Sequence, residues 1–138
     1  MPVVDASIVV DWVAPGVDRG GSAGRLLSRL ARERAPLLAP RLLFEETANA
    51  LITGIRRRRW SGTEADTAFV MLRRLPVDLV DQPGDLDRAF ELSRRYDEHP
   101  VYDLVYVAVA ERLGAQLVTA DEGLRARLGS LPFIVGPT

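Results

Sequence analysis

Short apolar runs rich in β-branched residues alternate along this chain with longer segments whose apolar residues recur at helical spacing. The short runs predict buried strands, and the longer segments predict amphipathic helices. Strands are expected at about residues 3–5, 36–40, 77–80, 116–119 and 133–135. Helices are expected at about residues 7–12, 22–34, 42–58, 63–75, 85–96, 101–113 and 122–128. Because strands and helices alternate throughout, the pattern predicts an α/β fold in which a central parallel sheet carries helices on both faces.

Local signals define several helix ends. Ser22 is expected to cap the second helix, and Thr63 with Asp66 resembles a capping box for the fourth. Gly114 follows the segment 101–113 and is expected as the C′ glycine that ends that helix. The segment 101–113 is apolar nearly all round, so we expect this helix to lie at the centre of the fold.

The composition is that of an ordinary globular domain. The chain has 138 residues, 47% of them hydrophobic, which fits a single domain over residues 1–138. It has no cysteine, which excludes disulfides and thiolate metal sites and favours a reducing, cytoplasmic setting. We see no signal peptide and no apolar run of the roughly 18 residues that a membrane span needs. All 18 basic residues are arginines, so chemistry that requires a lysine, such as a Schiff base or a P-loop, is excluded.

Four acidic residues are placed where such a sheet would gather them: Asp5, Glu46, Asp103 and Asp121. Asp5 and Asp121 follow predicted strands, and the functional crevice of an open α/β sheet lies beyond the carboxyl ends of its strands. Carboxylates that converge there repel one another unless a divalent cation lies between them. The sequence therefore predicts a Mg²⁺ or Mn²⁺ site of the kind that hydrolyses phosphodiesters.

The aspartates also have a simpler interpretation as helix caps. Asp5 and Asp121 each precede a predicted helix, and Asp103 stands at a helix start, where the dipole favours a negative charge. We prefer the joint interpretation, because Asp5 and Asp121 share one edge of the sheet if their strands are parallel. The helix that carries Asp103 leads directly into the strand before Asp121. Ser7 and Thr119, each two residues from one of these aspartates, offer hydroxyls that would hold a carboxylate or a water.

Two adjacent glutamates compete for one place in this cluster. Glu46 lies three residues before Asn49, the only asparagine in the chain, and positions i and i+3 share a helix face. The apolar residues around this pair predict that it borders the core. Glu45 falls about 100° away around the helix, and no residue pairs with it at this three-residue spacing. We therefore choose Glu46.

The chain resembles the PIN-domain ribonucleases, and among them the VapC-type toxins of bacterial toxin–antitoxin pairs. The matching segments are V-V-D-A-S at 3–7, P-x-L-L-F-E-E-T-A-N-A-L at 40–51, Y-D-L-V-Y-V-A-V-A at 102–110 and L-V-T-A-D-E at 117–122. The resemblance implies a PIN-like three-layer fold and a metal-dependent endoribonuclease with Asp5, Glu46, Asp103 and Asp121 as its acidic cluster. It also implies a homodimer and inhibition by a small antitoxin protein.

Two further features have more than one interpretation. The first is the run from Arg56 to Arg59, followed by Trp60, which has three interpretations. The arginines contact RNA phosphates while the indole stacks on a base, or they form a solvated helix end, or they contact the antitoxin. His99 is the only histidine, precedes Pro100, and is expected on the surface. A single imidazole excludes a metal-free ribonuclease that uses paired histidines.

Two other function classes fit the sequence less well than a ribonuclease. An aspartyl-phosphate phosphatase also places an aspartate after its first strand, but it needs a second acid where Ser7 stands, and usually a lysine. A catalytically silent module that binds RNA or antitoxin is the remaining alternative. Retention of all four acids argues against it, and a divalent-metal titration separates the two, because a silent module would not be stabilised by metal.

Overall fold

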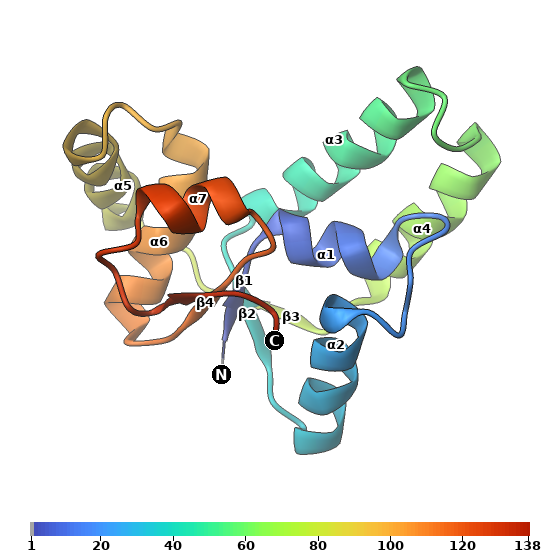
Figure 1. The fold of residues 1–138 in the computed structure, drawn as a ribbon, viewed down its shortest axis with the longest axis horizontal. Coiled ribbons are helices and arrows are strands. Elements are labelled where there is room, and N and C mark those ends of the chain that lie inside the picture. The colour runs from blue at the N-terminus through green and yellow to red at the C-terminus, as the bar shows by residue number, and fades with distance from the viewer. Residues whose placement is uncertain (1) are drawn as a thin grey trace.

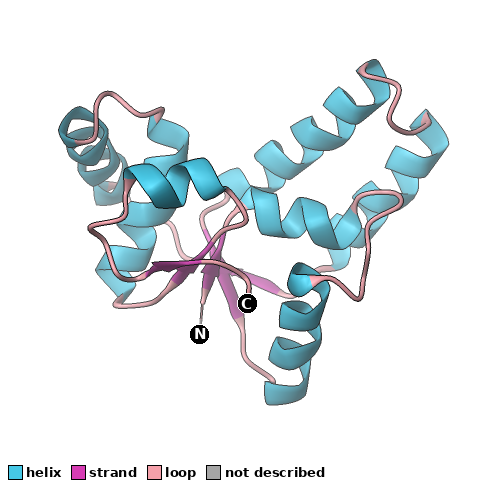
Figure 2. Ribbon diagram, viewed as in Figure 1, coloured by secondary structure: helices cyan, strands magenta, loops and turns pink. Residues whose placement is uncertain are grey.

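A five-stranded parallel sheet forms the centre of the molecule, in the order β3-β2-β1-β4-β5 (Figures 1 and 2). The computed structural model describes residues 2–138. The strands are β1 (Val3–Val4), β2 (Leu37–Ala39), β3 (Val77–Leu79), β4 (Leu117–Val118) and β5 (Ile134–Val135). Val3 lies opposite Leu38 on one side and opposite Leu117 on the other, so β1 is the central strand.

In the described part of the chain, seven helices cover the two faces of this sheet. They are α1 (Ala6–Val13), α2 (Ser22–Glu33), α3 (Leu42–Arg56), α4 (Gly62–Arg74), α5 (Gly84–Arg95), α6 (Val101–Leu113) and α7 (Glu122–Arg127). Helices α1 to α4 connect β1, β2 and β3 in one direction along the sheet, whereas α5 to α7 connect β3, β4 and β5 in the other. Right-handed crossovers in opposite directions place their helices on opposite faces. Accordingly α1 packs on α2, α3 and α4, and α5 packs on α6 (Figure 1). The predicted parallel sheet with helices on both faces is confirmed.

The hydrophobic core lies between β1, β4 and the two helix layers. Val3, Val4 and Leu117 are fully buried, as their place in central strands requires. Helix α6 is buried on most of its circumference, which confirms its predicted central position. Its bounds, 101–113, agree with the prediction, and Gly114 ends it with the left-handed φ of 61° that favours glycine. Within residues 2–138, no helix is long and apolar enough to cross a membrane.

The caps predicted for α2 and α4 differ from the structure. The capping box of α4 is formed by Ser61 and Glu64, not by Thr63 and Asp66. The Ser61 amide donates to Glu64 Oε1 at 2.9 Å, and the Glu64 amide donates to Ser61 Oγ at 3.1 Å. Glutamate has the extra methylene needed to reach back to the cap amide, which aspartate lacks. At α2, Ser22 is the first helical residue rather than the cap, because Gly21 occupies the cap position without a side-chain bond.

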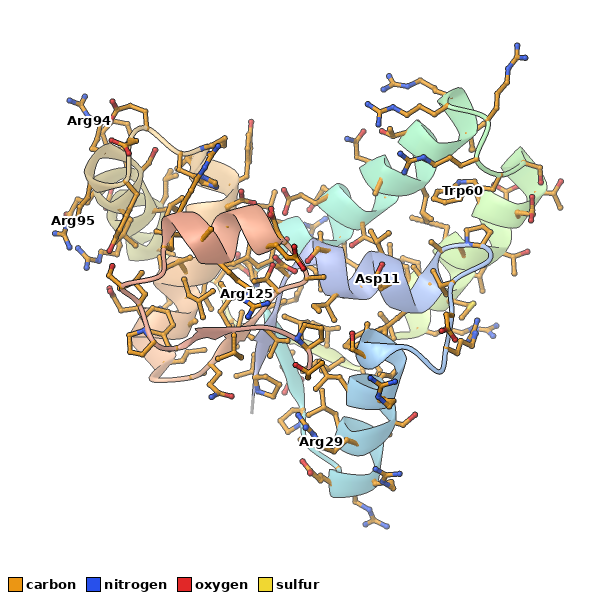
Figure 3. All side chains as sticks on the ribbon, viewed as in Figure 1. Asp11, Arg29, Trp60, Arg94, Arg95 and Arg125 are labelled. Carbon is orange, nitrogen blue, oxygen red and sulfur yellow. The ribbon has the colours of Figure 1, made fainter. Side chains whose placement is uncertain are left out.

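Helices α3 and α4 form an antiparallel hairpin that projects away from the sheet (Figure 1). A small apolar cluster around Leu51 and Ala68 joins the two helices. Trp60 lies between them (Figure 3), donates its indole N–H to the Leu51 carbonyl at 2.9 Å, and packs on Gly54. A Cβ at position 54 would overlap the indole ring, so a glycine is needed there. Trp60 is therefore a structural residue of the hairpin, and these contacts give no support to the interpretation in which its indole stacks on an RNA base.

Candidate active site

The predicted acidic residues lie around the point where the strand order reverses. The connection after β1 leads to β2 on one side, and the connection after β4 leads to β5 on the other. Divergence of two such connections opens a crevice at the carboxyl ends of the neighbouring strands, the usual place of a functional site in this architecture. Asp5 follows β1 directly, and Thr119 follows β4 directly. The topology thus brings together two segments more than a hundred residues apart in the chain.

Asp5 is the most enclosed of the four acids, with 6% of its surface exposed. Ser7 Oγ donates to its Oδ1 and Thr119 Oγ1 donates to its Oδ2, both at 2.5 Å. The Ile8 amide also donates to Oδ1, at 3.4 Å, so Asp5 is the N-cap of α1 as well. Burial raises the pKa of the Asp5 carboxyl, and the negative charge of Asp103 raises it further, against the lowering effect of its hydrogen bonds. Capping alone needs one amide bond, and it does not explain why each oxygen is also held by a hydroxyl.

The hydroxyls of Ser7 and Thr119 connect the loop after β1 to the loop after β4. Their oxygens lie 3.3 Å apart. Ser7 Oγ accepts from the Ala120 amide at 2.9 Å, and Thr119 Oγ1 accepts from the Asp121 amide at 3.0 Å. Each hydroxyl therefore donates to Asp5 and accepts from the β4–α7 loop, which fixes the distance between the two walls of the crevice.

Glu46 faces the crevice from α3, and Glu45 does not. The Tyr106 hydroxyl donates to Glu46 Oε1 at 2.6 Å. Burial raises the pKa of the Glu46 carboxyl, although the phenol hydrogen bond lowers it, and the charges of the two nearby aspartates, Asp103 and Asp5, raise it further. Glu45 is exposed and pairs with Arg41 at 3.3 Å. This partner lies four residues before Glu45, so no residue pairs with Glu45 at the three-residue spacing that relates Glu46 to Asn49. Asn49 is exposed and does not border the core as expected.

Asp103 enters the crevice from the first turn of α6, with its side chain 33% exposed. Its Oδ2 lies 2.6 Å from His99 Nε2. The prediction that His99 lies on the surface was wrong: it is 6% exposed. The turn before α6 folds back on α5, since the Ser93 hydroxyl donates to the His99 carbonyl and the His99 amide donates to the Tyr96 carbonyl. Burial of a loop residue through such contacts cannot be read from local sequence.

Tyr106 is a site residue that was not assigned from the sequence. It lies three positions after Asp103 on α6, hence on the same helix face, and is 1% exposed. Burial raises the pKa of its hydroxyl far above the ordinary range, and the adjacent Glu46 carboxylate raises it further. The phenol therefore stays protonated and serves as a fixed donor to Glu46. The two tyrosines of Y-D-L-V-Y are the sequence feature from which this role could have been recognised. Only their helical spacing from Asp103 distinguishes buried Tyr106 from exposed Tyr102.

Asp121 lies at the rim. Its side chain is exposed and accepts from the Leu124 amide at 3.0 Å, which makes it the N-cap of α7. The structure thus couples Asp5, Glu46 and Asp103 electrostatically and adds Asp121 through its backbone bond to Thr119.

The carboxylates form a loose ring, not a closed cage. Among residues 2–138, no three Asp, Glu or His side chains converge tightly enough to form a ready-made ligand set. Each acid is directed to its own donor instead: Glu46 to a phenol, Asp103 to an imidazole and Asp121 to an amide. The oxygen-only donor set and its surplus of negative charge still suit Mg²⁺, which keeps several of its waters and needs only one or two protein carboxylates.

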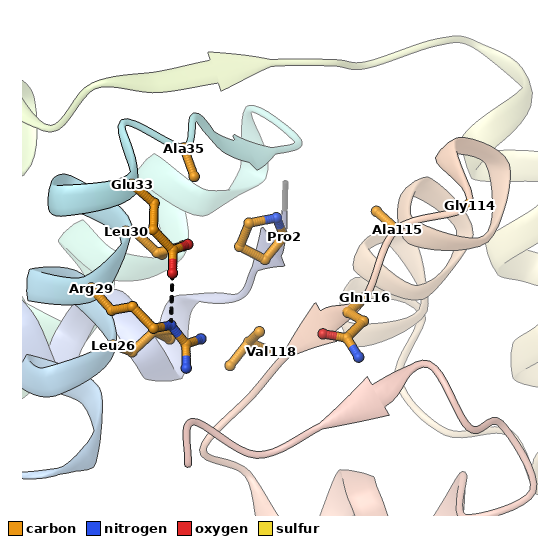
Figure 4. A pocket seen from close by; sticks show the side chains of 10 residues that line it. All are labelled: Pro2, Leu26, Arg29, Leu30, Glu33, Ala35, Gly114, Ala115, Gln116 and Val118. Atoms are coloured by element: carbon orange, nitrogen blue, oxygen red, sulfur yellow. Dashed lines mark ion pairs between the residues drawn. The ribbon is translucent and has the colours of Figure 1, made fainter.

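The cavity drawn in Figure 4 lies away from these acids. It is lined by Pro2 and Gln116, which precede β1 and β4, so it opens at the amino ends of the strands, the edge opposite the crevice. Its one carboxylate, Glu33, pairs with Arg29 at 4.0 Å (Figure 4). A neutralised surface pair offers nothing to a cation, and the cavity gathers none of the predicted site residues.

The exposed arginines lie at the far tip of the α3–α4 hairpin. Arg56, Arg57, Arg58 and Arg59 are all exposed, and Arg57 and Arg58 form the turn that ends α3. The hairpin carries these charges away from the sheet (Figure 1). Exposure is compatible with a solvated helix end, with RNA phosphates and with a protein partner.

Comparison with known proteins identifies relatives of this sequence and of this fold. A family model described as "PIN domain" matches residues 3–127. Ribonuclease VapC9 of Mycobacterium tuberculosis is 34% identical over 121 residues, which cover 88% of this chain and 86% of that protein. The crystal structure of PAE2754 from Pyrobaculum aerophilum has a TM-score of 0.72 at 25% identity, over 99% of this chain and 83% of that one. A chain in a toxin–antitoxin complex from Klebsiella pneumoniae has a TM-score of 0.68 at 16% identity, over 100% of this chain and 98% of that one, which shows a shared fold.

Proposed function

The chain belongs to the PIN-domain family, and from that membership we propose that it is an endoribonuclease that acts as the toxin of a toxin–antitoxin pair. The observation that carries the proposal is the ring of Asp5, Glu46 and Asp103 at the strand switch point. The charge of Asp103 raises the pKa of both Asp5 and Glu46, and the charge of Asp5 also raises the pKa of Glu46. The name of the relative VapC9, a ribonuclease of similar length, supports RNA as the substrate. We regard residues 1–138 as one PIN domain, since the family match spans 3–127.

We propose that the activity depends on a divalent cation, Mg²⁺ or Mn²⁺. Asp5, Glu46, Asp103 and Asp121 are the residues that would hold it. A bound cation of this kind supplies an activated water and neutralises charge on the leaving oxygen of the phosphodiester. The protein's own contribution is positional: Ser7 and Thr119 fix the Asp5 carboxylate, and the Tyr106 hydroxyl fixes Glu46. Without such partners, ring carboxylates would move apart, because like charges repel.

We propose two protein partners, a small antitoxin and a second copy of the chain. The likeness to a chain from a toxin–antitoxin complex supports the antitoxin, and the family resemblance supports the homodimer. We place the protein in the cytoplasm, where its proposed substrate is found. A catalytically silent module that binds RNA or antitoxin is the competing function. The three hydroxyls that orient the acidic side chains argue against it, because a binding module has no need of carboxylates held at fixed positions.

The proposal is tested by mapping cleaved RNA ends in cells after induction of the protein. Wild type should produce new ends at defined sites and arrest growth, whereas Asp5→Asn should produce none. Glu45→Gln is the matched control, since it removes an acidic charge from an exposed position beside the ring. Growth arrest without new RNA ends, or equal cleavage by Asp5→Asn, would contradict the proposed function. A silent module would also show no stabilisation by Mn²⁺.

A further inference from the structure

Three side chains from three elements form one continuous chain of polar contacts beside the acidic ring. Arg127 Nη1, at the end of α7, lies 3.1 Å from His99 Nδ1. His99 Nε2, in the turn before α6, lies 2.6 Å from Asp103 Oδ2 on the first turn of that helix. The imidazole thus bridges a guanidinium and a carboxylate through its two nitrogens.

The contact with Arg127 decides which nitrogen of His99 carries the proton. A guanidinium only donates hydrogen bonds, so Nδ1 must accept and must be unprotonated. The proton of the neutral ring therefore lies on Nε2, which donates it to Asp103 Oδ2. We propose that His99, held in this Nε2–H tautomer by Arg127, is a positioning residue that orients the Asp103 carboxylate toward the crevice.

The backbone around His99 is built to hold the ring in place. Its carbonyl accepts from the Ser93 hydroxyl, and its amide donates to the Tyr96 carbonyl. Asp97 and Glu98, immediately before it, both have left-handed backbone conformations, with φ of 56° and 54°. Two successive non-glycine residues in this region are strained, and such strain persists only where the surrounding structure over-determines it. The strained turn therefore fixes the position of the buried His99 ring, whereas a histidine on the surface would be free to move.

The two carboxylate oxygens of Asp103 therefore have different roles. Oδ2 is occupied by His99, so Oδ1 is the oxygen left for a cation or a water; this step rests on the proposed function. Carboxylates that bind metals are commonly fixed by an outer hydrogen-bond donor, whose removal lowers metal affinity by roughly 10- to 100-fold. The competing interpretation is a staple, in which His99 only ties the turn to the first turn of α6 and contributes to stability alone.

The tautomer is measured directly in the wild-type protein, because His99 is the only histidine in the chain. A long-range ¹H–¹⁵N correlation spectrum therefore shows a single imidazole. Above neutral pH and without metal, we expect Nε2 to be protonated and Nδ1 to resonate as a lone-pair nitrogen. Arg127→Gln should shift the Nδ1 signal, whereas Arg125→Gln, two positions away on α7, should not. An Nδ1–H tautomer, or a ring that averages between tautomers, would overturn the assignment.

The positioning role is measured by Mn²⁺ affinity, read from the free-ion signal in electron paramagnetic resonance. We expect His99→Ala to weaken Mn²⁺ binding roughly tenfold, and His99→Gln, which places an N–H donor near the position of Nε2, to restore most of it. A staple would instead lower the melting temperature of His99→Ala and leave its Mn²⁺ affinity unchanged, which would overturn the proposal. Absence of Mn²⁺ binding in the wild type would contradict the proposed function, while the imidazole spectrum would still decide the tautomer.

Discussion

Asp5 has two roles that a pair of substitutions separates: it caps α1, and it places a charge in an almost buried position. Because its pKa is raised in the folded state, the native protein holds a proton on Asp5 more tightly than the unfolded chain does. The contribution of Asp5 to the free energy of unfolding is therefore fully present below its unfolded pKa near 3.8. It is lost as the pH rises through the pKa that Asp5 has in the folded protein. At neutral pH without metal, the ionised carboxylate destabilises the fold, and Asp5→Asn should remove that penalty.

The magnitude follows from what each substitution keeps. The side chain introduced by Asp5→Asn retains an oxygen that caps α1, and its amide can donate where the carboxylate accepted, so the Thr119 hydroxyl can rotate to pair with it. Asp5→Ala removes the cap, which typically lowers stability by about 1 kcal/mol, and leaves two hydroxyls without their acceptor. In a domain of this size about 1 kcal/mol corresponds to about 3 °C in melting temperature. We expect Asp5→Asn to melt at or above the wild-type temperature in EDTA, and Asp5→Ala to melt about 3–6 °C below Asp5→Asn.

Thermal scans in EDTA and in Mn²⁺ complete the test. A ligand that binds only the native state adds about 2.7 kcal/mol at a concentration 100 times its Kd, so Mn²⁺ should raise the wild-type melting temperature by about 8 °C. Asp5→Asn should gain much less. Strong destabilisation of Asp5→Asn in EDTA would show that the charge itself is structural, and would refute the assignment of Asp5 to a metal-binding ring.

Three further outcomes follow from the same geometry. Glu46→Gln should lower RNA cleavage by more than about 100-fold, which exceeds the loss expected for a residue that only hydrogen-bonds to a metal ligand. Glu45→Gln should leave cleavage unchanged. Equal losses would show that the wrong face of α3 has been assigned to the site. Tyr106→Phe should lower cleavage about tenfold and stability by about 1 kcal/mol, and an unchanged rate would remove its role in holding Glu46. Arg57→Ala and Arg58→Ala should each reduce the salt slope of RNA binding by roughly 0.7. If antitoxin affinity falls instead, the hairpin tip belongs to the partner.

Much of the architecture was accessible from the sequence because its signals are local. Helix α6 lies between Pro100 and Gly114, which define its start and its end, and its all-round apolar surface indicates a central position. Asp5 follows a β-branched run at the carboxyl end of a strand, where a parallel sheet exposes side chains to a crevice. The choice of Glu46 over Glu45 rested on Asn49. The structure gives a different physical reason, the contact with Tyr106 across the crevice.

The features that the sequence did not reveal depend on contacts between distant segments or on small differences in reach. His99 looked like a surface loop residue, and its burial depends on the turn that folds back on α5. Its contact with Arg127 spans 28 positions, and no spacing rule predicts it. The capping box was displaced by two residues because Ser61-x-x-Glu64 and Thr63-x-x-Asp66 overlap, and side-chain length chose between them.

Analysis of the products of RNA cleavage by the purified protein tests the central claim most directly. One defined RNA is incubated with the wild-type protein in Mg²⁺ and in excess EDTA, and the ends of the fragments are identified by mass spectrometry. A water activated by metal attacks phosphorus without using the 2′-hydroxyl. We therefore predict fragments with 5′-phosphate and 3′-hydroxyl ends in Mg²⁺ and intact RNA in EDTA. Undiminished cleavage in EDTA, or fragments that end in a 2′,3′-cyclic phosphate, would contradict a site built from Asp5, Glu46, Asp103 and Asp121.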